Sequence, residues 1–134
     1  MREIRTTDLL CPCCGQGVPS LLLLAGLNEI QQLIGTELRI TSGCRCPKHN
    51  AAVGGAPHSE HLTGDAADLK AAGRNPLELY LAADEYPPFT HGGIGLYPGD
   101  FIHVDVRPSR ARWFRVAGKD HPIADYLATH AHLP

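Results

Sequence analysis

The chain has 134 residues, of which 43% are hydrophobic and 19% charged, a composition typical of a folded globular protein rather than a disordered one. Its 12 Lys and Arg against 14 Asp and Glu give a formal net charge of -2, which disfavours nucleic acid as a partner because such proteins carry a basic surplus. The 14 glycines and 11 prolines favour a loop-rich α+β body over a helical bundle. We expect one domain over residues 1–134, long enough to bury roughly two-thirds of the unfolded surface.

No segment of the sequence has the character of a membrane span or an export signal. The longest unbroken apolar run, residues 21–25, is far too short to cross a bilayer. Residues 1–5 lack the apolar stretch and the small-residue cleavage site of a signal peptide. We therefore expect a monomer that is cytoplasmic at synthesis and has no membrane span.

The hydrophobic pattern predicts a small antiparallel sheet with helices packed on one of its faces. Ser20 is suited to cap a helix that Gly35 ends, and residues 43–64 read as an irregular loop. Pro87 and Pro88 are expected to stop the second helix. The predicted elements are, in chain order, helix 21–34, strand 37–42, strand 65–70, helix 76–85, a hairpin of strands 92–97 and 101–107, and helix 123–130.

Two segments carry residues suited to metal chemistry. His61 and Asp68 are seven positions apart with glycine and alanine between them, a spacing that suits two side chains converging on one ion across a tight turn. In strand 101–107, alternation places His103, Asp105 and Arg107 on one face and apolar residues on the other. Two imidazoles and one carboxylate form a three-ligand zinc site with an open position for water. Zinc lowers the pKa of that water toward ~7 and polarises a carbonyl, which suits amide hydrolysis.

Several separated stretches resemble the zinc D-alanyl-D-alanine carboxypeptidase family, which groups with lysostaphin-type enzymes and the hedgehog signalling domain. The resemblance runs from about Leu21 to Trp113 and is to the phage and bacterial cell-wall branch. It implies the α+β fold of that group, with the zinc site on the sheet. The matching stretches are 59–68 (S-x-H-x-x-G-x-A-x-D), 41–50 (TSGCRCPKHN), 53–57 (VGGAP), 92–98 (GGIGLYP) and 101–107 (FIHVDVR).

The resemblance assigns roles to individual positions. It implies that His61, Asp68 and His103 are the zinc ligands and that one catalytic zinc is bound. Arg45 matches the family arginine that binds the carboxylate or backbone oxygens of the substrate. Ser59 reads either as a turn hydroxyl bonded to the local backbone or as a group that holds a ligand or substrate.

The general base is left between two acids. The family often has an acidic residue three positions before the last histidine ligand, which is Asp100 here. The F-[IV]-H-V-D branch offers Asp105 instead, and strand geometry favours Asp105 as a partner of the site or as the base. We favour Asp100, because at the entry of the strand it can reach across the metal.

The resemblance also implies a substrate, the stem peptide of bacterial peptidoglycan. The reaction is either a D,D-carboxypeptidase cleavage or an endopeptidase cleavage such as that between L-alanine and D-glutamate. The size and the absent export signal suit an endolysin of phage or prophage origin that acts on the cell wall after release. Two other classes compete: a non-catalytic, hedgehog-like zinc binding module, and an interaction domain organised by cysteine-bound zinc.

The five cysteines fall into two tight groups. Cys11 and Cys13, and likewise Cys44 and Cys46, are two positions apart, so each pair shares a face in an extended chain. This arrangement predicts that segment 1–19 is clamped to the body either by disulfides or by a second, structural zinc. Reduced thiols are the cytosolic default, which favours bound metal or free thiols over disulfides. A lysin released from the cell could oxidise, however, so disulfides, zinc-bound thiolates and free thiols all stay open. The fifth cysteine is unassigned.

Other polar and aromatic residues are given structural roles. We assign Trp113 to core packing, with a position along the substrate groove as the alternative. His58 is expected in a solvated loop. Gly93 and Gly95 are expected to allow close packing on their strand, because no phosphate-loop lysine motif follows them.

Overall fold

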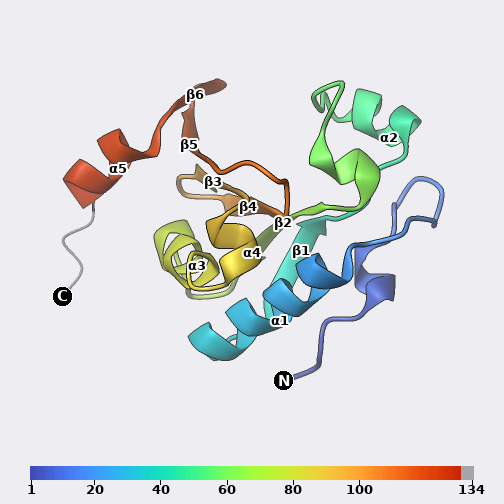
Figure 1. Cartoon of the computed structure of the whole chain (residues 1–134), viewed down its shortest axis with the longest axis horizontal. Coiled ribbons are helices and arrows are strands. Elements are labelled where there is room, and N and C mark those ends of the chain that lie inside the picture. The colour runs from blue at the N-terminus through green and yellow to red at the C-terminus, as the bar shows by residue number, and fades with distance from the viewer. Residues whose placement is uncertain (131–134) are drawn as a thin grey trace.

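The computed structural model describes residues 1–130, an α+β fold built on one six-stranded sheet (Figure 1). Its helices are η1 (Thr6–Leu9), α1 (Leu21–Ile34), α2 (Pro47–Ala52), η2 (Glu60–Thr63), α3 (Pro76–Ala83), α4 (Pro87–Thr90) and α5 (Ile123–His130), where η denotes a 3-10 helix. Its strands are β1 (Leu38–Ser42), β2 (Ala66–Ala71), β3 (Gly93–Tyr97), β4 (Phe101–Asp105), β5 (Ala111–Val116) and β6 (Lys119–Pro122). None of the described helices is long and apolar enough to cross a membrane.

Helix α1 forms where the sequence predicts it. The Ser20 hydroxyl accepts a hydrogen bond from the Leu23 N–H (3.3 Å) and caps the helix. Gly35 ends it with a φ of 65°, a left-handed conformation that glycine adopts without a Cβ clash. Leu23, Leu27 and Ile30 lie buried on one face of α1, at the three- and four-residue steps expected of an amphipathic helix.

The strand order of the sheet is β1-β2-β4-β3-β5-β6. The predicted hairpin of β3 and β4 is confirmed, with Tyr97 paired with Phe101 beside the turn. Every other neighbouring pair is antiparallel too, except that β3 and β5 run parallel. The expected antiparallel sheet is therefore a mixed one. Since β4 is already flanked by β2 and β3, the next strand joins the free edge of β3, and a chain that reverses after β4 runs parallel to β3.

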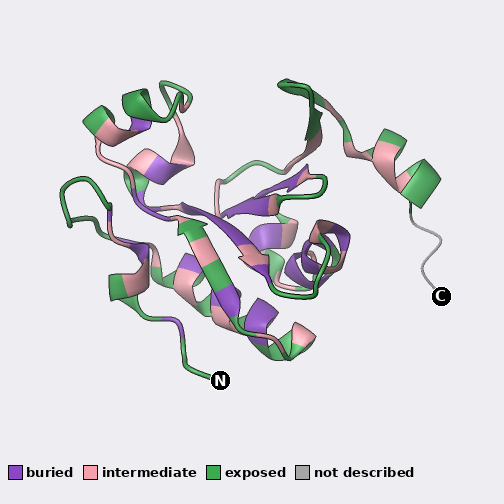
Figure 2. Ribbon diagram, turned by 180° about the vertical axis from the view of Figure 1, so that it is seen from behind, coloured by how far each residue is buried: buried purple, intermediate pink, exposed green. Residues whose placement is uncertain are grey.

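The hydrophobic core lies between one face of the sheet and helices α1, α3 and α4 (Figure 2). Leu69 of β2, Ile94 of β3 and Ile102 of β4 are fully buried there beneath Leu27 and Phe89. On the opposite face, η2 packs against β2, and α2 packs against η2. One side of the sheet thus supplies stability, which leaves the other available to carry polar side chains.

Two predictions, the irregular loop over residues 43–64 and the end of the second helix at Pro87, are wrong in part. Segment 43–64 contains α2, which begins at Pro47 after the Cys46 cap, and the short helix η2. Pro87 does follow the end of α3, but it also begins α4. Proline is favoured at the first position of a helix, because its missing N–H has no intrahelical partner there in any case.

Helix α1 crosses the core helices closely at Gly26. A Cβ at this position would lie 2.5 Å from the Phe89 ring and 2.6 Å from Tyr86. Gly26→Ala gains about 1 kcal/mol of helix propensity but overpacks the core, which typically costs about 1–3 kcal/mol. We expect a net loss in the free energy of unfolding, measured by urea denaturation. The exposed neighbour Ala25→Gly should lose only about 1 kcal/mol, and a stabilised Gly26→Ala protein would contradict the packing described here.

Candidate metal centre

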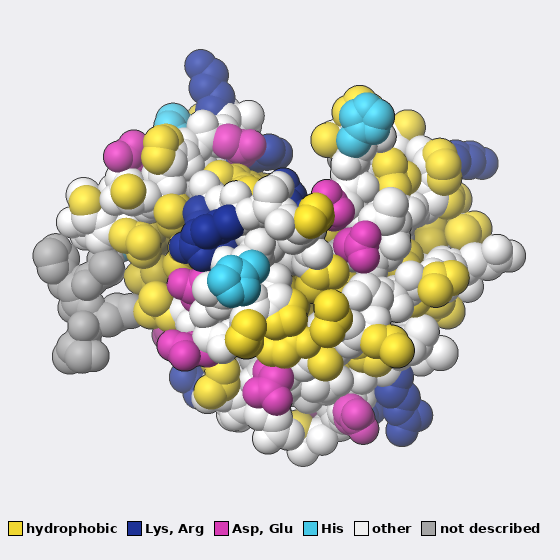
Figure 3. Space-filling model, viewed as in Figure 1, with side chains coloured by type: hydrophobic (Ala, Val, Ile, Leu, Met, Phe, Trp, Pro, Cys, Tyr) yellow, Lys and Arg dark blue, Asp and Glu magenta, His cyan; other side chains and the backbone are white. Residues whose placement is uncertain are grey.

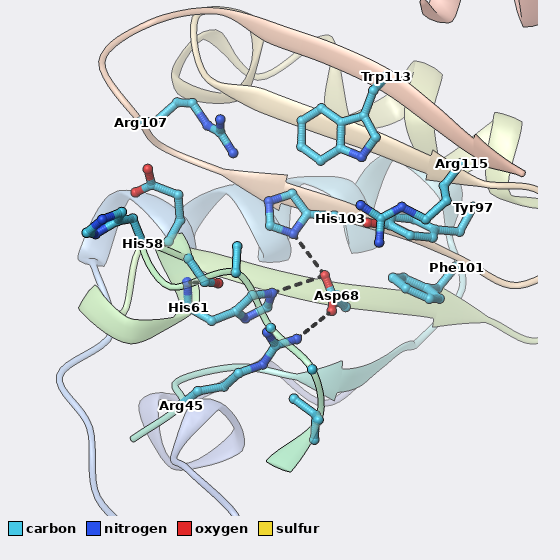
Figure 4. A pocket seen from close by; sticks show the side chains of 16 residues that line it. Arg45, His58, His61, Asp68, Tyr97, Phe101, His103, Arg107, Trp113 and Arg115 are labelled. Atoms are coloured by element: carbon cyan, nitrogen blue, oxygen red, sulfur yellow. Dashed lines mark hydrogen bonds and ion pairs between the residues drawn. The ribbon is translucent and has the colours of Figure 1, made fainter. Parts of the chain in front are cut away.

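The structure brings His61, Asp68 and His103 together on the face of the sheet opposite the core (Figure 4). Asp68 of β2 and His103 of β4 are direct cross-strand partners, while His61 reaches them from η2. One ligand atom from each of the three residues lies within 4.8 Å of the other two. All three residues are buried, with exposed fractions of 2%, 7% and 8%.

The S-x-H-x-x-G motif forms the short helix that carries His61. The Ser59 hydroxyl accepts a hydrogen bond from the His61 N–H (3.2 Å), and Gly64 ends the turn with a φ of 76°. A Cβ at Gly64 would also run into the Val18 carbonyl. The His61 carbonyl accepts the Arg45 N–H (3.0 Å), which ties η2 to the chain after β1. These contacts fix the backbone from which the imidazole projects.

Hydrogen bonds on the outer side of each ring determine which ring nitrogens are free. His61 Nδ1 lies 2.7 Å from the Gly43 carbonyl, which can only accept, so Nδ1 carries the proton. His103 Nε2 donates in the same way to Asp105 Oδ2 (2.7 Å). The inner nitrogens, His61 Nε2 and His103 Nδ1, both lie against Asp68 Oδ1, at 3.2 and 3.0 Å, and are free to bind a cation when the imidazoles are neutral.

A cation that takes the place of the inner imidazole protons would find three donor atoms converging on it. Burial alone would raise the pKa of Asp68, but hydrogen bonds from His103 and His61 hold that pKa well below its usual range, so the carboxylate is ionised. Nitrogen and oxygen donors of this kind are the ligands that zinc takes in proteins, and histidine ligands bonded outward to a carbonyl or carboxylate are characteristic of zinc sites. The residues present therefore fit a zinc ion.

Asp105 lies behind His103 and is fully buried. Its carboxylate accepts hydrogen bonds from the Gly93 N–H (2.9 Å) and from the Arg107 side chain (2.8 and 2.6 Å) as well as from His103. Burial favours its neutral form, yet His103 and Arg107 lower the pKa of Asp105. The ionised Asp105 carboxylate thus orients the His103 ring. It faces away from the three ligand atoms.

Asp105→Asn should weaken zinc binding. The amide keeps the volume of the carboxylate but loses its charge, and changes to such partners typically reduce metal affinity by about 10–100-fold. Competition with a chelator of known affinity measures the change. Asp120, an exposed acid paired with Arg115, provides the control Asp120→Asn, whose zinc affinity should equal that of the wild type. An equal affinity in Asp105→Asn would rule out the orienting role.

A pocket of about 560 Å³ opens beside the three ligands. The surface is hollowed between the part of the molecule that carries α2 and the part that carries β5 and β6 (Figure 3). One wall is the segment between α2 and η2, and the other is formed by the sheet. The lining residues are Arg45, Val53, Gly54, Gly55, Ala56, His58, Ser59, Glu60, His61, Asp68, Tyr97, Phe101, His103, Arg107, Trp113 and Arg115.

Arg45 lies in this pocket and is held by three hydrogen bonds. Its Nε donates to Ser42 Oγ (3.1 Å), Nη1 to Asn50 Oδ1 (3.2 Å) and Nη2 to Asp68 Oδ2 (3.4 Å). Asp68 therefore directs one oxygen to the imidazoles and the other to the guanidinium. A guanidinium has five N–H donors, so Arg45 retains donors for a substrate group in the pocket.

Asp100 lies in the turn before β4, and its carboxylate accepts a hydrogen bond from Lys70 Nζ (3.2 Å). Lys70 is two positions after Asp68 on β2, so both side chains project from the same face of the sheet. Asp100 is therefore linked to the strand that carries Asp68, although it is not among the described residues that line the pocket. Both partners are exposed, and such pairs contribute little stability.

Much of the aromatic and basic wall of the pocket was not predicted. Trp113 lines the pocket, with its ring centroid 5.3 Å from that of His103, so its expected place in the core is wrong and the alternative place along the groove is confirmed. Arg115 lies over Tyr97, which stacks on Phe101 at 4.2 Å. His58 also lines the pocket rather than only a solvated loop. Alternation with His103 could have indicated Phe101, but β5 had not been predicted at all.

The close packing expected of the β3 glycines is confirmed. A Cβ on Gly95 would overlap the Trp113 indole, and one on Gly93 would overlap the Asp105 carboxylate. The absent side chains let the Trp113 ring and the Asp105 carboxylate approach the backbone of β3 closely. Both contacts border the metal ligands.

The cysteines group differently from the predicted pairs. All five lie within the described residues and are free thiols. The sulfurs of Cys11, Cys14 and Cys46 converge, while Cys44 is buried against Gly17. Burial favours the neutral Cys11 thiol, but backbone N–H groups, that of Cys46 foremost, lower the pKa of Cys11 to about 6. The Cys46 thiol, in turn, raises the pKa of Cys13.

The fold and the ligand set define a class of protein. Two imidazoles and one carboxylate beside an open pocket are the ligand set that the catalytic zinc sites of metallopeptidases use. The sequence model of the family Peptidase M15 matches residues 4–105. The chain therefore belongs to the Peptidase M15 family of zinc metallopeptidases, and the match includes all three ligands but ends before β5. No curated protein matches the chain.

Proposed function

We propose that this protein hydrolyses an amide bond in the stem peptides of bacterial peptidoglycan, with zinc bound by His61, Asp68 and His103. The observation that carries the proposal is the convergence of three possible metal-ligand atoms at the side of an open pocket. The opposite nitrogen of each imidazole is already bonded. Membership of Peptidase M15 supports the peptidase chemistry, and the resemblance of the sequence to the cell-wall branch supports the substrate.

The chain provides the groups that such a hydrolysis requires. Zinc, when bound, supplies Lewis acidity toward the carbonyl and lowers the pKa of water. Arg45 holds the substrate carboxylate or the developing oxyanion through its remaining N–H groups. Asp105 keeps His103 in the orientation and tautomer that leave Nδ1 free. Asp100 leaves Lys70 and accepts the proton of the attacking water at a carboxylate oxygen.

The pocket suits an anionic peptide. The three arginines Arg45, Arg107 and Arg115 line it, together with the stacked pair Tyr97 and Phe101. Guanidinium groups bind carboxylates in a bidentate manner, and stem peptides carry free carboxylates along their length. This charge distribution supports both candidate reactions, removal of a terminal D-alanine and cleavage between L-alanine and D-glutamate. We place the activity at the cell wall, after release of the protein from the cell, as in an endolysin.

Digestion of purified peptidoglycan tests the proposal. The protein is incubated with the polymer as purified, after treatment with a chelator, and after zinc is restored, and the soluble fragments are identified by mass spectrometry. We expect new fragments that disappear with chelation and return with zinc. Release of free D-alanine identifies a carboxypeptidase, and fragments cut within the stem identify an endopeptidase. A zinc-loaded, folded protein that releases neither contradicts the proposal.

One observation favours a non-catalytic alternative, a zinc-bearing binding module of the hedgehog kind. Asp100 is bonded to Lys70 in this structure, and Asp105 is saturated with hydrogen bonds. A module of this kind would bind stem peptides and zinc yet release no fragment in the same digestion. Sedimentation with insoluble peptidoglycan in the absence of cleavage would identify it.

A further inference from the structure

Three cysteine sulfurs converge outside the pocket, next to Arg45, which lines the pocket. The Sγ atoms of Cys11, Cys14 and Cys46 lie within 4.8 Å of one another. Cys11 and Cys14 come from the turn after η1, and Cys46 is the N-cap of α2. A group bound by these sulfurs would therefore join the N-terminal segment to the chain that carries Arg45.

The backbone around the cluster is arranged to support charged sulfur. The Cys46 N–H donates to Cys11 Sγ (3.4 Å), and the His49 N–H donates to Cys46 Sγ (3.4 Å). Hydrogen bonds to an ionised acceptor are stronger than those to a neutral one. In the turn, Gly15 has a φ of 71°, and its N–H donates to the Cys11 carbonyl (2.7 Å). This conformation folds Cys14 back toward Cys11.

The spacing of these residues is that of zinc-binding cysteines. Cys11 and Cys14 form a C-x-x-C pair, within the range that structural zinc sites use, and the third sulfur comes from a remote segment. Cys13, between them in the sequence, is outside the three converging sulfurs but is exposed, and its thiol is the nearest in the chain that could turn inward as a fourth ligand. Thiolates are soft ligands and select zinc over harder cations. The third converging sulfur also distinguishes this arrangement from a simple disulfide, which would bond two sulfurs and leave one unpaired.

We propose that Cys11, Cys14 and Cys46 bind a structural zinc ion, with Cys13 as the fourth ligand. Four thiolates leave no open position, so this ion serves the fold and not the reaction. It closes the chain between the N-terminal turn and α2, where the backbone is already bridged by the Cys44 N–H and the Leu9 carbonyl (2.8 Å). Because Arg45 directly precedes Cys46, the ion also fixes the backbone on one side of Arg45, which lines the pocket.

Cobalt replacement tests this site separately from the histidine site. Cobalt bound to thiolates gives a ligand-to-metal charge-transfer absorption in the near ultraviolet, and the His61–Asp68–His103 set has no sulfur to produce one. The full-length protein, purified under reducing conditions, is stripped and titrated with Co²⁺. We expect this absorption in the wild type and equally in His61→Ala, together with two zinc ions per chain in the untreated wild type and one in His61→Ala.

Matched cysteine variants locate the ligands. Cys14→Ser should lose most of the charge-transfer absorption and unfold at a lower temperature, whereas Cys44→Ala should keep the absorption, because its sulfur lies outside the cluster. The wild-type spectrum decides the question even if Cys14→Ser does not fold. Absence of the absorption in cobalt-loaded wild type overturns the proposal. A thiol titration of protein purified without reductant and then denatured also overturns the proposal if it finds fewer than five free thiols.

Discussion

His61→Ala is expected to remove the zinc of the histidine site and abolish peptide hydrolysis. His61 supplies one of three ligands, and the remaining two acceptors, Asp68 and His103, cannot hold a catalytic zinc that normally takes three protein ligands. The His61 Nδ1–H also anchors the ring to the Gly43 carbonyl. No neighbouring side chain can take up this fixed position. Metal analysis of the purified protein and digestion of peptidoglycan measure the two losses together.

The matched control for this variant is His91→Ala. His91 is an exposed histidine at the end of α4, on the helical side of the sheet. The control should keep its zinc content and activity, and circular dichroism should show that both variants are folded. Retention of full activity by folded His61→Ala would contradict the assignment of the ligand.

Asp100→Asn is expected to lower turnover by about 10²–10⁴-fold, the usual contribution of a general acid–base group, while the zinc content is unchanged. The carboxylate is exposed, and its partner Lys70 holds it only through a surface ion pair, so an amide should leave the fold intact. Steady-state kinetics on a stem-peptide substrate, with metal analysis of the same sample, measure both quantities.

Two further variants make the result decisive. Glu78→Gln removes an exposed, paired acid on α3, and its turnover should match the wild type. Lys70→Met removes the partner of Asp100 without removing the acid, so turnover should persist. Wild-type turnover in Asp100→Asn would exclude Asp100 as the base. Glu60, an acid that lines the pocket, would then be the candidate for the base.

The sequence pattern, together with the family resemblance, predicted the three residues that the structure brings together, His61, Asp68 and His103. His61 lies in the short helix η2, whose cap, Ser59, and terminal glycine, Gly64, are both visible in the motif, and Asp68 follows on β2. His103 lies on a strand whose alternation separates polar from apolar residues, and Asp105 continues the same face. Pattern and spacing determine these local relations, whereas the pairing of β2 with β4, which places His103 beside Asp68, joins residues 35 positions apart.

The second wall of the pocket could not be predicted in this way. Trp113 and Arg115 reach the pocket only because β5 pairs in parallel with β3, a contact between segments that no hairpin joins. The packing of Trp113 over Gly95 depends on that register. The glycine indicated a close approach, but nothing nearby in the sequence indicated which side chain approaches.

The cysteines show a different kind of error. Pairing Cys11 with Cys13 assumed an extended chain, in which alternate residues share a face. Gly15 instead adopts a left-handed conformation in a turn, so residues three apart come together and Cys14 joins Cys11. The C-x-x-C spacing was present in the sequence, and the conformation of the turn decides between the two pairings.

Anomalous X-ray diffraction from crystals of the zinc-loaded protein, recorded on both sides of the zinc absorption edge, tests the central claim most directly. We expect a zinc peak at bonding distance from His61 Nε2, Asp68 Oδ1 and His103 Nδ1, with the fourth position open to the pocket. A map with no peak among these atoms, or with a protein atom occupying the fourth position, would contradict it.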